Sequence, residues 1–494
     1  QAPNGDQIVR AKMPSDAQSS VVNGMVTDVA STLHANAFPT AVNNQITEAG
    51  AGTTAPILPD LTQLLVDARL RDCVGMIARL TDIPALRKPS RRVLSAAGAE
   101  PISGDCETFS EPPSGKTITP AVLDTLYSVN SAPALPQRLR RPSASQGVLE
   151  ATSSPFSSTD FACFLSAFGL PQAQVQLETQ VGDILDANCM QDCDEANLDV
   201  QYMSAMNPGN DVEVFYATDL FDILYHITSE NLPAVLSISY GAKESAIPPE
   251  LAVQVCNEIG YAALRGTTIF VSSGDTGATD GTCTSYTVEF PASCPYVTAV
   301  GATVGFAPGT EVVAELSAGA IITSGGGFSR IFTDDNVNLE WQSANTTAYL
   351  NAHASASASG FATNGRGVPD IAAAGAFYAI VVDGNFNRVD GTSASAPVMA
   401  GLTARAMSEL GLDRIGWINP LLYSGRAKFF DVVSGGNSGT ESVAQCLDSN
   451  QAGLPFGFSA APGWDPASGL GTLGVEGGYE AFRDLLAAAS WWWW

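Results

Sequence analysis

Apolar and polar positions in the middle of the chain follow two alternating periods, which predicts strands and helices in turn. Short runs rich in β-branched residues at 212–217, 234–240 (AVLSISY) and 267–273 indicate buried strands. Helical spacing of apolar residues at 219–229 and 249–264 fills the intervals between them. Strand, helix and strand at this spacing form a βαβ unit, so the sequence predicts an α/β fold with a parallel sheet covered by helices.

Residues 1–116 have a different character from the rest of the chain. They are rich in Ala, Ser, Thr and Pro, and one amphipathic stretch stands out at 61–80. Arg91 and Arg92 form a paired basic site that suits proteolytic processing, although such pairs also occur on ordinary solvated surfaces. After residue 116 the apolar and polar positions follow the strand and helix periods more regularly. We therefore predict an N-terminal extension or prosegment remnant at 1–116 and a main domain at 117–494.

Composition and charge exclude several classes of protein. Of the 494 residues, 45% are apolar, which is enough for a sizeable core. Asp and Glu total 50 against 23 Lys and Arg, a formal net charge of −27 at pH 7. Such a surface repels phosphate backbones, so nucleic acid is not an expected partner. Much of the self-repulsion vanishes near the sequence pI of about 4.2, which favours a protein that works in acid.

The cysteines and the start of the chain favour export. Nine cysteines and one Asn-x-Thr sequon, at Asn345, suit an oxidising compartment. The chain begins at Gln1 without an apolar leader, as expected of a protein whose signal peptide has been removed, and no run reaches the roughly 18 apolar residues of a membrane span. We expect secretion or an acidic lumenal compartment (lysosome or vacuole), with a cytosolic protein bearing reduced cysteines as the alternative.

The segment GTSASAP at 391–397 offers a nucleophile. It leads into the apolar run 398–410, and Pro397 is tolerated in the first turn of a helix, where its missing N–H is no loss. Ser393 is therefore expected at a helix N-terminus, where free N–H groups can stabilise an oxyanion on an attacked carbonyl. The alternative is an ordinary serine that caps the helix.

A nucleophilic serine needs a base, and the three histidines are poor candidates. His34 lies in the N-terminal region, His226 lies within an apolar helical run where a packed histidine is expected, and His353 lies in a stretch rich in Ala and Ser. None has the glycine-flanked setting of a subtilisin-like histidine, so the base is expected to be another residue type.

Three carboxylates are candidates for the site, and two of them are candidates for the base. Glu195 and Asp199 are spaced i, i+4, which places them on one face of a helix, and two neighbouring carboxyl groups can share a proton in acid. On spacing alone, the pair could equally be a solvated acidic face. Asp275 follows the strand at 267–273, where the chemistry of a parallel sheet gathers. Among other carboxylates it would be protonated, and so able to donate a hydrogen bond to an oxyanion.

Together these segments resemble the sedolisin family of serine-carboxyl peptidases, the group with a subtilisin-like fold that includes kumamolisins and tripeptidyl-peptidases. The resemblance covers roughly 117–475, and ITPAVLDTLYSV (118–129) is similar to the start of the family's mature domain. The other matching segments, in the family's order, are EANLDVQYMSAM (195–206), VLSISYG (235–241), VSSGDTGA (271–278), FPASCPYVTAVGAT (290–303), SGGGFS (324–329), GRGVPDIAAAG (365–375) and DGTSASAP (390–397).

The resemblance implies a fold and a role for each candidate. The expected fold is a subtilisin-like, doubly wound parallel sheet with helices on both faces. Ser393 would be the nucleophile, Glu195 the general base, Asp199 the partner that orients Glu195, and Asp275 the oxyanion donor. Residues 1–116 do not clearly match the family's long propeptide, and the tail Trp491–Trp494 resembles nothing in the family.

The resemblance also implies one structural calcium ion near the C-terminus. Asp431 and Val432, with the later Ala461, Gly463 and Asp465, resemble the family's calcium loop, in which two carboxylates and backbone carbonyls meet a hard cation. Residue 461 is Ala where Gly is expected, but only its carbonyl would be needed. Without the family, these residues would be interpreted as a turn.

The function expected from the sequence is that of an acid-acting serine-carboxyl peptidase with peptides or proteins as substrates. The residues after Glu195 and the Ser239-Tyr240 pair resemble tripeptidyl-peptidases more than bacterial endopeptidases. The alternatives are an endopeptidase of the same family and an inactive homologue that binds peptides or has a structural role. A histidine-dependent subtilisin relative is disfavoured by the missing histidine motif.

Overall fold

The computed structural model describes residues 94–95, 116–130, 144–151, 154–178, 193–218, 220–228, 231–353, 360–426, 428–443, 445–448 and 454–488. The chain separates into two compact units between Ile83 and Pro84, and every described residue belongs to the second. The amphipathic stretch 61–80, the Arg91-Arg92 site and the tryptophan tail lie outside the described residues. The division at residue 116 therefore stays a prediction.

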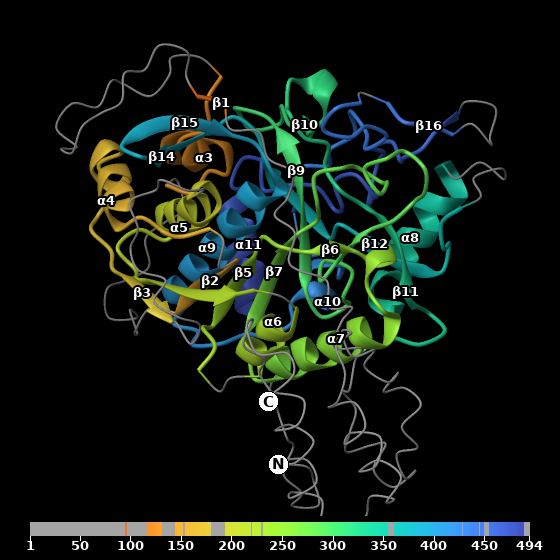
Figure 1. Ribbon diagram of the computed structural model, residues 1–494, viewed down its shortest axis with the longest axis horizontal. Helices are drawn as coiled ribbons and strands as arrows, with labels where there is room; N and C mark the ends of the chain where they lie inside the picture. Colours follow the sequence, from red (N-terminus) through yellow and green to blue (C-terminus); the bar gives the residue numbers. More distant parts are fainter. Residues whose placement is uncertain are drawn as a thin grey trace, which may run out of the picture. The chain divides into compact units, whose positions relative to one another are not determined.

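A largely parallel sheet forms the centre of the described unit (Figure 1). Its order is β10-β9-β7-β5-β2-β4-β3, β13 pairs with β9, and only β10 is antiparallel to its neighbour. The strands are β2 (Gln146–Ala151), β3 (Val175–Glu178), β4 (Val212–Ala217), β5 (Val235–Ile238), β7 (Thr268–Ser272), β9 (Thr298–Val304), β10 (Val312–Val313) and β13 (Ile371–Ala374). The predicted parallel α/β sheet is confirmed.

The elements expected from the hydrophobic pattern are present with small changes at their ends. The strand predicted at 212–217 and the helix predicted at 249–264 have the predicted bounds, as β4 and as α7 (Pro249–Leu264). The helix predicted at 219–229 is α6 (Leu220–Ile227). The strands predicted at 234–240 and 267–273 are shorter at both ends, as β5 and β7, and the residues that follow them lead into the loops with Ser239 and Asp275.

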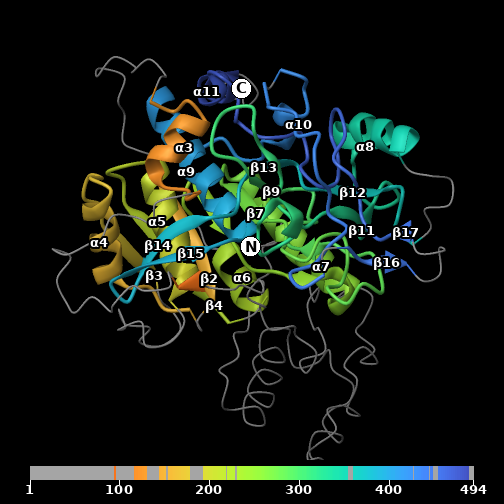
Figure 2. The same cartoon turned by 90° about the horizontal axis from the view of Figure 1, so that it is seen from above.

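Helices cover both faces of the sheet because successive side chains of a strand point to opposite faces. In β2, Val148 belongs to one hydrophobic core and Leu149 to the other, and Val235 and Leu236 of β5 divide in the same way. The first core contains α3 (Pro120–Leu126), α4 (Ser158–Ala167), α5 (Asp194–Met206), α9 (Thr392–Leu410) and α11 (Gly478–Ala487), whereas the second contains α6 and α7. Figure 2 shows the first group of helices from above.

Two helices of the first core lie in direct contact, and both carry candidate site residues. A Cβ added to Gly401 of α9 would lie 2.6 Å from the backbone oxygen of Met203 in α5. A glycine at this position lets the two backbones approach closely. The approach fixes the N-terminal turn of α9, with Ser393, relative to the N-terminal half of α5, with Glu195 and Asp199.

Smaller elements surround this frame. A hairpin of β14 (Tyr378–Val382) and β15 (Asn385–Val389) takes β1 (Leu94–Ser95) as a third, antiparallel strand, so this dipeptide of the predicted extension joins the main domain. The remaining elements are β6 (Ala242–Lys243), η4 (Glu244–Ala246), β8 (Glu289–Phe290), η5 (Leu316–Ala318), β11 (Gly327–Thr333), α8 (Glu340–His353), β12 (Gly365–Val368), α10 (Asn419–Leu422), β16 (Leu447–Asp448) and β17 (Leu454–Pro455).

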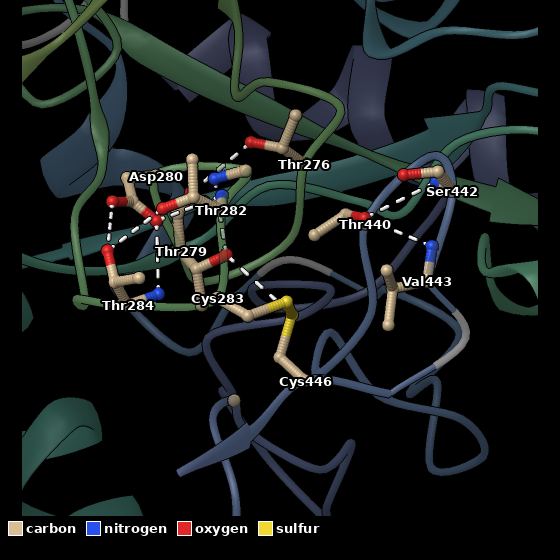
Figure 3. The surroundings of a disulfide bond; sticks show 12 residues. Thr276, Thr279, Asp280, Thr282, Cys283, Thr284, Thr440, Ser442, Val443 and Cys446 are labelled. Atoms are coloured by element: carbon tan, nitrogen blue, oxygen red, sulfur yellow. Dashed lines mark hydrogen bonds between the residues drawn. A yellow bond between two sulfur atoms is a disulfide. The ribbon is translucent and has the colours of Figure 1, made fainter. Parts of the chain in front are cut away.

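Disulfide bonds tie distant parts of the described chain together. Cys256 of α7 pairs with Cys294, and Cys283 pairs with Cys446 across 163 positions of sequence. The second bond joins the loop that follows Asp275 to the C-terminal segment (Figure 3). Disulfides persist in oxidising compartments, which agrees with the setting expected from the cysteine count. Within the part of the chain that the structure describes, no helix is long and apolar enough to cross a membrane.

Candidate active site

Ser393 is the second residue of α9 and is buried, with an exposed fraction of 1%. Gly391 precedes the helix, and a Cβ added to it would lie 3.5 Å from both Ser393 Oγ and Asp275 Oδ2. The two oxygens therefore face the same small space beside the helix N-terminus. Neither oxygen has a hydrogen-bond partner among the described residues. An attacked carbonyl needs a nucleophile and an oxyanion donor close together in this way.

Asp275 is fixed to the start of α9 through Thr392. Its Oδ1 accepts hydrogen bonds from the Thr392 backbone N–H, at 2.8 Å, and from the Thr392 hydroxyl, at 2.9 Å. The same hydroxyl oxygen accepts a bond from the Gly274 N–H at 3.0 Å. Because Oδ1 is fully engaged, Oδ2 is the oxygen left to face Ser393.

Burial is the main reason that Asp275 resists ionisation. It raises the pKa of this carboxyl from 3.8 to about 7, although the two hydrogen bonds from Thr392 act in the opposite direction. The negative charges of Glu289 and Glu195 raise the pKa further, by smaller amounts. Asp275 is therefore protonated in acid, as predicted. The cause differs from the crowding by carboxylates that the sequence suggested, because desolvation dominates.

Glu195 and Asp199 are fully buried on α5, so the interpretation of them as a solvated acidic face is wrong. Asp199 Oδ2 accepts a hydrogen bond of 2.5 Å from the hydroxyl of Ser239, which follows β5. The Ser239 hydroxyl also lies 3.4 Å from the backbone oxygen of Ser393. Ser239 thus connects the carboxylate pair to the turn that bears the candidate nucleophile.

A further carboxylate, Glu150, lies in this buried region and was missed by the sequence interpretation. It is in β2, has an exposed fraction of 0%, and its Oε2 accepts a hydrogen bond of 2.9 Å from the Tyr240 hydroxyl. Burial raises the pKa of Tyr240 well above 10, and the charges of Glu150, Glu195 and Asp199 add to this effect. The signal available in the sequence was a single acidic residue inside the apolar run GVLEA.

A glycine-rich segment supports the loop that carries Asp275. Thr323 N donates to Asp275 O at 2.9 Å, and Gly325 N donates to Gly274 O at 2.6 Å. A Cβ on Gly325 would lie 2.4 Å from the backbone oxygen of Ser273, so only glycine fits beneath this loop. The matching segment SGGGFS therefore has a physical role, which is to hold the end of β7.

The described histidines lie elsewhere. His226, on α6, is buried, packs against the Phe215 ring, and has Nε2 2.8 Å from the Tyr216 carbonyl oxygen. Its helix belongs to the core on the opposite face of the sheet from α9. The prediction of a packed histidine is confirmed. His353 ends α8 and is exposed, and His34 lies outside the described residues.

The residues predicted to form the calcium loop come together. Asp431 Oδ2 accepts from Gly463 N at 2.9 Å, and Asp465 Oδ2 accepts from Ala461 N at 3.1 Å. The Ser468 hydroxyl lies within 3.4 Å of both Asp465 and the Val432 carbonyl oxygen. No three His, Cys, Asp or Glu side chains gather as a metal site among the described residues. The predicted loop contains two carboxylates, the ligand type that suits a hard cation, and both accept hydrogen bonds from backbone N–H groups of the turn.

Comparisons of sequence match the chain to curated peptidases. The Subtilase family matches residues 203–420. Probable tripeptidyl-peptidase SED3 of Trichophyton verrucosum is 31% identical over 444 residues, which cover 82% of this chain and 71% of that protein. Tripeptidyl-peptidase SED3 of Arthroderma otae is 33% identical over 326 residues, which cover 59% of this chain and 52% of that protein. The chain thus spans about half of some curated relatives and about seven-tenths of others.

A comparison of structures gives the same fold. The sedolisin of Pseudomonas, a serine-carboxyl proteinase solved with two molecules of pseudo-iodotyrostatin, matches with a TM-score of 0.58 at 24% identity. The match covers 75% of this chain and 99% of that one. The subtilisin-like fold predicted from the sequence is confirmed.

Proposed function

We propose that this chain, which belongs to the sedolisin family of serine-carboxyl peptidases, hydrolyses peptide bonds in acid through an acyl-enzyme on Ser393. The observation that carries the proposal is the pairing of Ser393 Oγ and Asp275 Oδ2 around Gly391, at the N-terminus of α9. The buried carboxylates of α5 add the proton acceptor that the described histidines do not provide.

In the proposed reaction, Ser393 Oγ attacks the substrate carbonyl and its proton passes to Glu195. Asp199, held by Ser239, keeps Glu195 in place. The new oxyanion accepts a hydrogen bond from protonated Asp275 at Oδ2 and from N–H groups at the start of α9. Glu195 then returns the proton to the leaving amine, and a water molecule activated in the same way hydrolyses the ester.

The cleavage mode that we propose is the removal of tripeptides from free N-termini. The support comes from the tripeptidyl-peptidases among the relatives and from the acidic character of the chain. A charge-assisted hydrogen bond from a protonated amine to a carboxylate is roughly twice as strong as a neutral one. A peptide with a free amine should therefore be cut three residues from its end, whereas its N-acetylated twin should be left intact.

Mass spectrometry of both peptides after digestion in acid measures this directly. The control is the same pair incubated with Ser393→Ala protein. Equal cutting of the two peptides at internal bonds would show an endopeptidase instead. Failure of the wild-type protein to cut either would favour an inactive, peptide-binding homologue.

We also propose that Asp431, Asp465 and the carbonyl oxygens of Val432, Ala461 and Gly463 hold one structural calcium ion. The convergence of both carboxylates on the turn 461–465 supports this assignment. Bound calcium would neutralise two charges that otherwise repel each other, and so tie the segment after Phe430 to the C-terminal segment.

Removal of calcium should lower the melting temperature, because an ion that binds only the folded chain stabilises it by mass action. Asp465→Ala should give a similar loss, and its melting temperature should no longer respond to added calcium. Calorimetry of calcium-loaded and chelated protein tests this, with Asp335→Asn, in an exposed turn, as the control. A chelated wild type that melts at the loaded temperature would refute the site.

We also propose that the protein is secreted or resides in an acidic lumenal compartment. The disulfides between described cysteines support it, as does a sequon whose Asn345 lies on the partly exposed side of α8.

A further inference from the structure

A second charged pair lies beside Asp275. Lys243 of β6 and Glu289 of β8 stand directly opposite each other in an antiparallel pair of strands, with Nζ and Oε1 3.0 Å apart. The exposed fractions of their side chains are 18% and 17%, so the pair lies at the edge of the buried region. The mechanism proposed above does not use either residue.

The pair contacts the chain on both sides of Asp275. Before it, Gly274 has φ +106°, and a Cβ there would lie 2.7 Å from Glu289 Cδ, so the Glu289 carboxylate rests directly on the Gly274 backbone. After it, the Thr276 hydroxyl accepts a hydrogen bond of 2.5 Å from Lys243 Nζ. Thr276 begins the loop shown in Figure 3, which the Cys283–Cys446 disulfide closes. Asp275 therefore lies between Gly274, which contacts Glu289, and Thr276, which is hydrogen-bonded to Lys243.

The pair also supplies one of the charges that act on Asp275. Two carboxylates face it, Glu195 from α5 and Glu289 from β8, and each disfavours its ionisation. Thr392, from the start of α9, contributes only uncharged hydrogen-bond donors. Lys243, from β6, is the cation that partly neutralises Glu289. Glu289 is the more exposed of the two carboxylates, so its charge can be changed with little disturbance of the core.

We propose that the Lys243–Glu289 ion pair positions Asp275 and sets the pH above which the enzyme loses activity. Glu289 favours the protonated donor, and Lys243 limits this effect while it anchors Thr276. Both are positioning residues, since they act on the oxyanion through Asp275. The inference rests on the proposed role of Asp275 as a protonated donor.

Single substitutions should move the alkaline limb of the kcat/KM profile in opposite directions. Glu289→Gln removes a negative charge, so Asp275 ionises more easily and the limb should move toward acid by about half a pH unit. Lys243→Met leaves Glu289 without its cation, so the limb should move toward higher pH, with a lower kcat because Thr276 is released. Joint substitution should bring the limb back toward that of the wild type.

Glu409→Gln is the matched control. Glu409 pairs with Arg405 at 3.1 Å, with exposed fractions of 25% and 21%, in the last turns of α9. The alkaline limb of the kcat/KM profile of Glu409→Gln should coincide with that of the wild type. The proposal is overturned if Glu289→Gln behaves as this control does, or if both substitutions in the pair move the limb in one direction, as simple loss of structure would.

Direct titration separates this inference from the proposed function. In the Ser393→Ala background, the Asp275 carboxyl can be followed by infrared difference spectroscopy and identified by its loss in Asp275→Asn. An acidward shift of its titration with Glu289→Gln supports the inference even if the chain proves to cleave no peptide. An unshifted titration overturns it even if the peptidase is active.

Discussion

Ser393→Ala should lower kcat to less than about a thousandth of the wild-type value while the protein stays folded. The substitution removes one oxygen that has no hydrogen-bond partner among the described residues, so the fold loses little. The hydroxyl of Thr392 cannot take its place readily, because it is bonded to Asp275 Oδ1. The loss should appear in kcat rather than in KM, because the hydroxyl reacts and contributes little to substrate binding.

Ser395→Ala is the control for this experiment. Ser395 lies two positions further along α9 and is also buried, but its hydroxyl donates to the Ala373 and Ala374 carbonyl oxygens. Its removal should lower the melting temperature and keep activity within about tenfold of wild type, since a buried hydrogen bond contributes about 1 kcal/mol to stability. Activity of Ser393→Ala above about a thousandth of wild type would count against Ser393 as the nucleophile.

Asp275→Ala should reduce kcat by roughly 10²–10³, the usual cost of losing one oxyanion donor. Asp275→Asn should reduce it less. Its amide oxygen can keep the two bonds from Thr392 while its NH₂ group takes the place of protonated Oδ2. The pair of substitutions therefore separates the donor function from the carboxyl group itself.

The two variants should also differ from wild type in their pH profiles. The wild-type donor is present below the raised pKa of Asp275, about 7, and is lost as the pH rises through that value. Asparagine does not titrate in this range, so the alkaline limb of Asp275→Asn should move to higher pH. If that limb stays where it is, another group sets it. A neutral optimum in the wild type would contradict the carboxylate mechanism as a whole.

The same carboxyl makes the fold more stable in acid. The pKa of Asp275 is higher in the folded chain, about 7, than its ordinary value of 3.8. Its contribution to stability is therefore complete below about pH 4 and is lost as the pH rises through about 7. Asp275→Asn should flatten this part of the stability profile, which thermal unfolding between pH 3 and 8 would measure.

The local sequence pattern was sufficient to predict those features that depend on a residue and its near neighbours in the chain. The βαβ elements were predictable because strands buried on both faces are mostly apolar and β-branched, as β5 (VLSI) and β7 (TIFVS) are. The position of Ser393 followed from the glycine turn before the helix, whereas Pro397 is the sixth residue of α9 and not in its first turn as expected. These features depend on contacts within a few residues, which the sequence contains.

The sequence by itself determined the α/β class, the place of Ser393 at the start of a helix and, through the family resemblance, which carboxylates to consider. Only the tertiary structure decided that Glu195 and Asp199 are buried, that Glu150 and Tyr240 join them, and that Glu289 lies against Gly274. Burial is set by what other elements place over a side chain, here α9 across α5 and β8 across the end of β7. The ionisation of Asp275 follows from that burial, because the free energy of a charge depends on the medium around it and not on its neighbours in sequence.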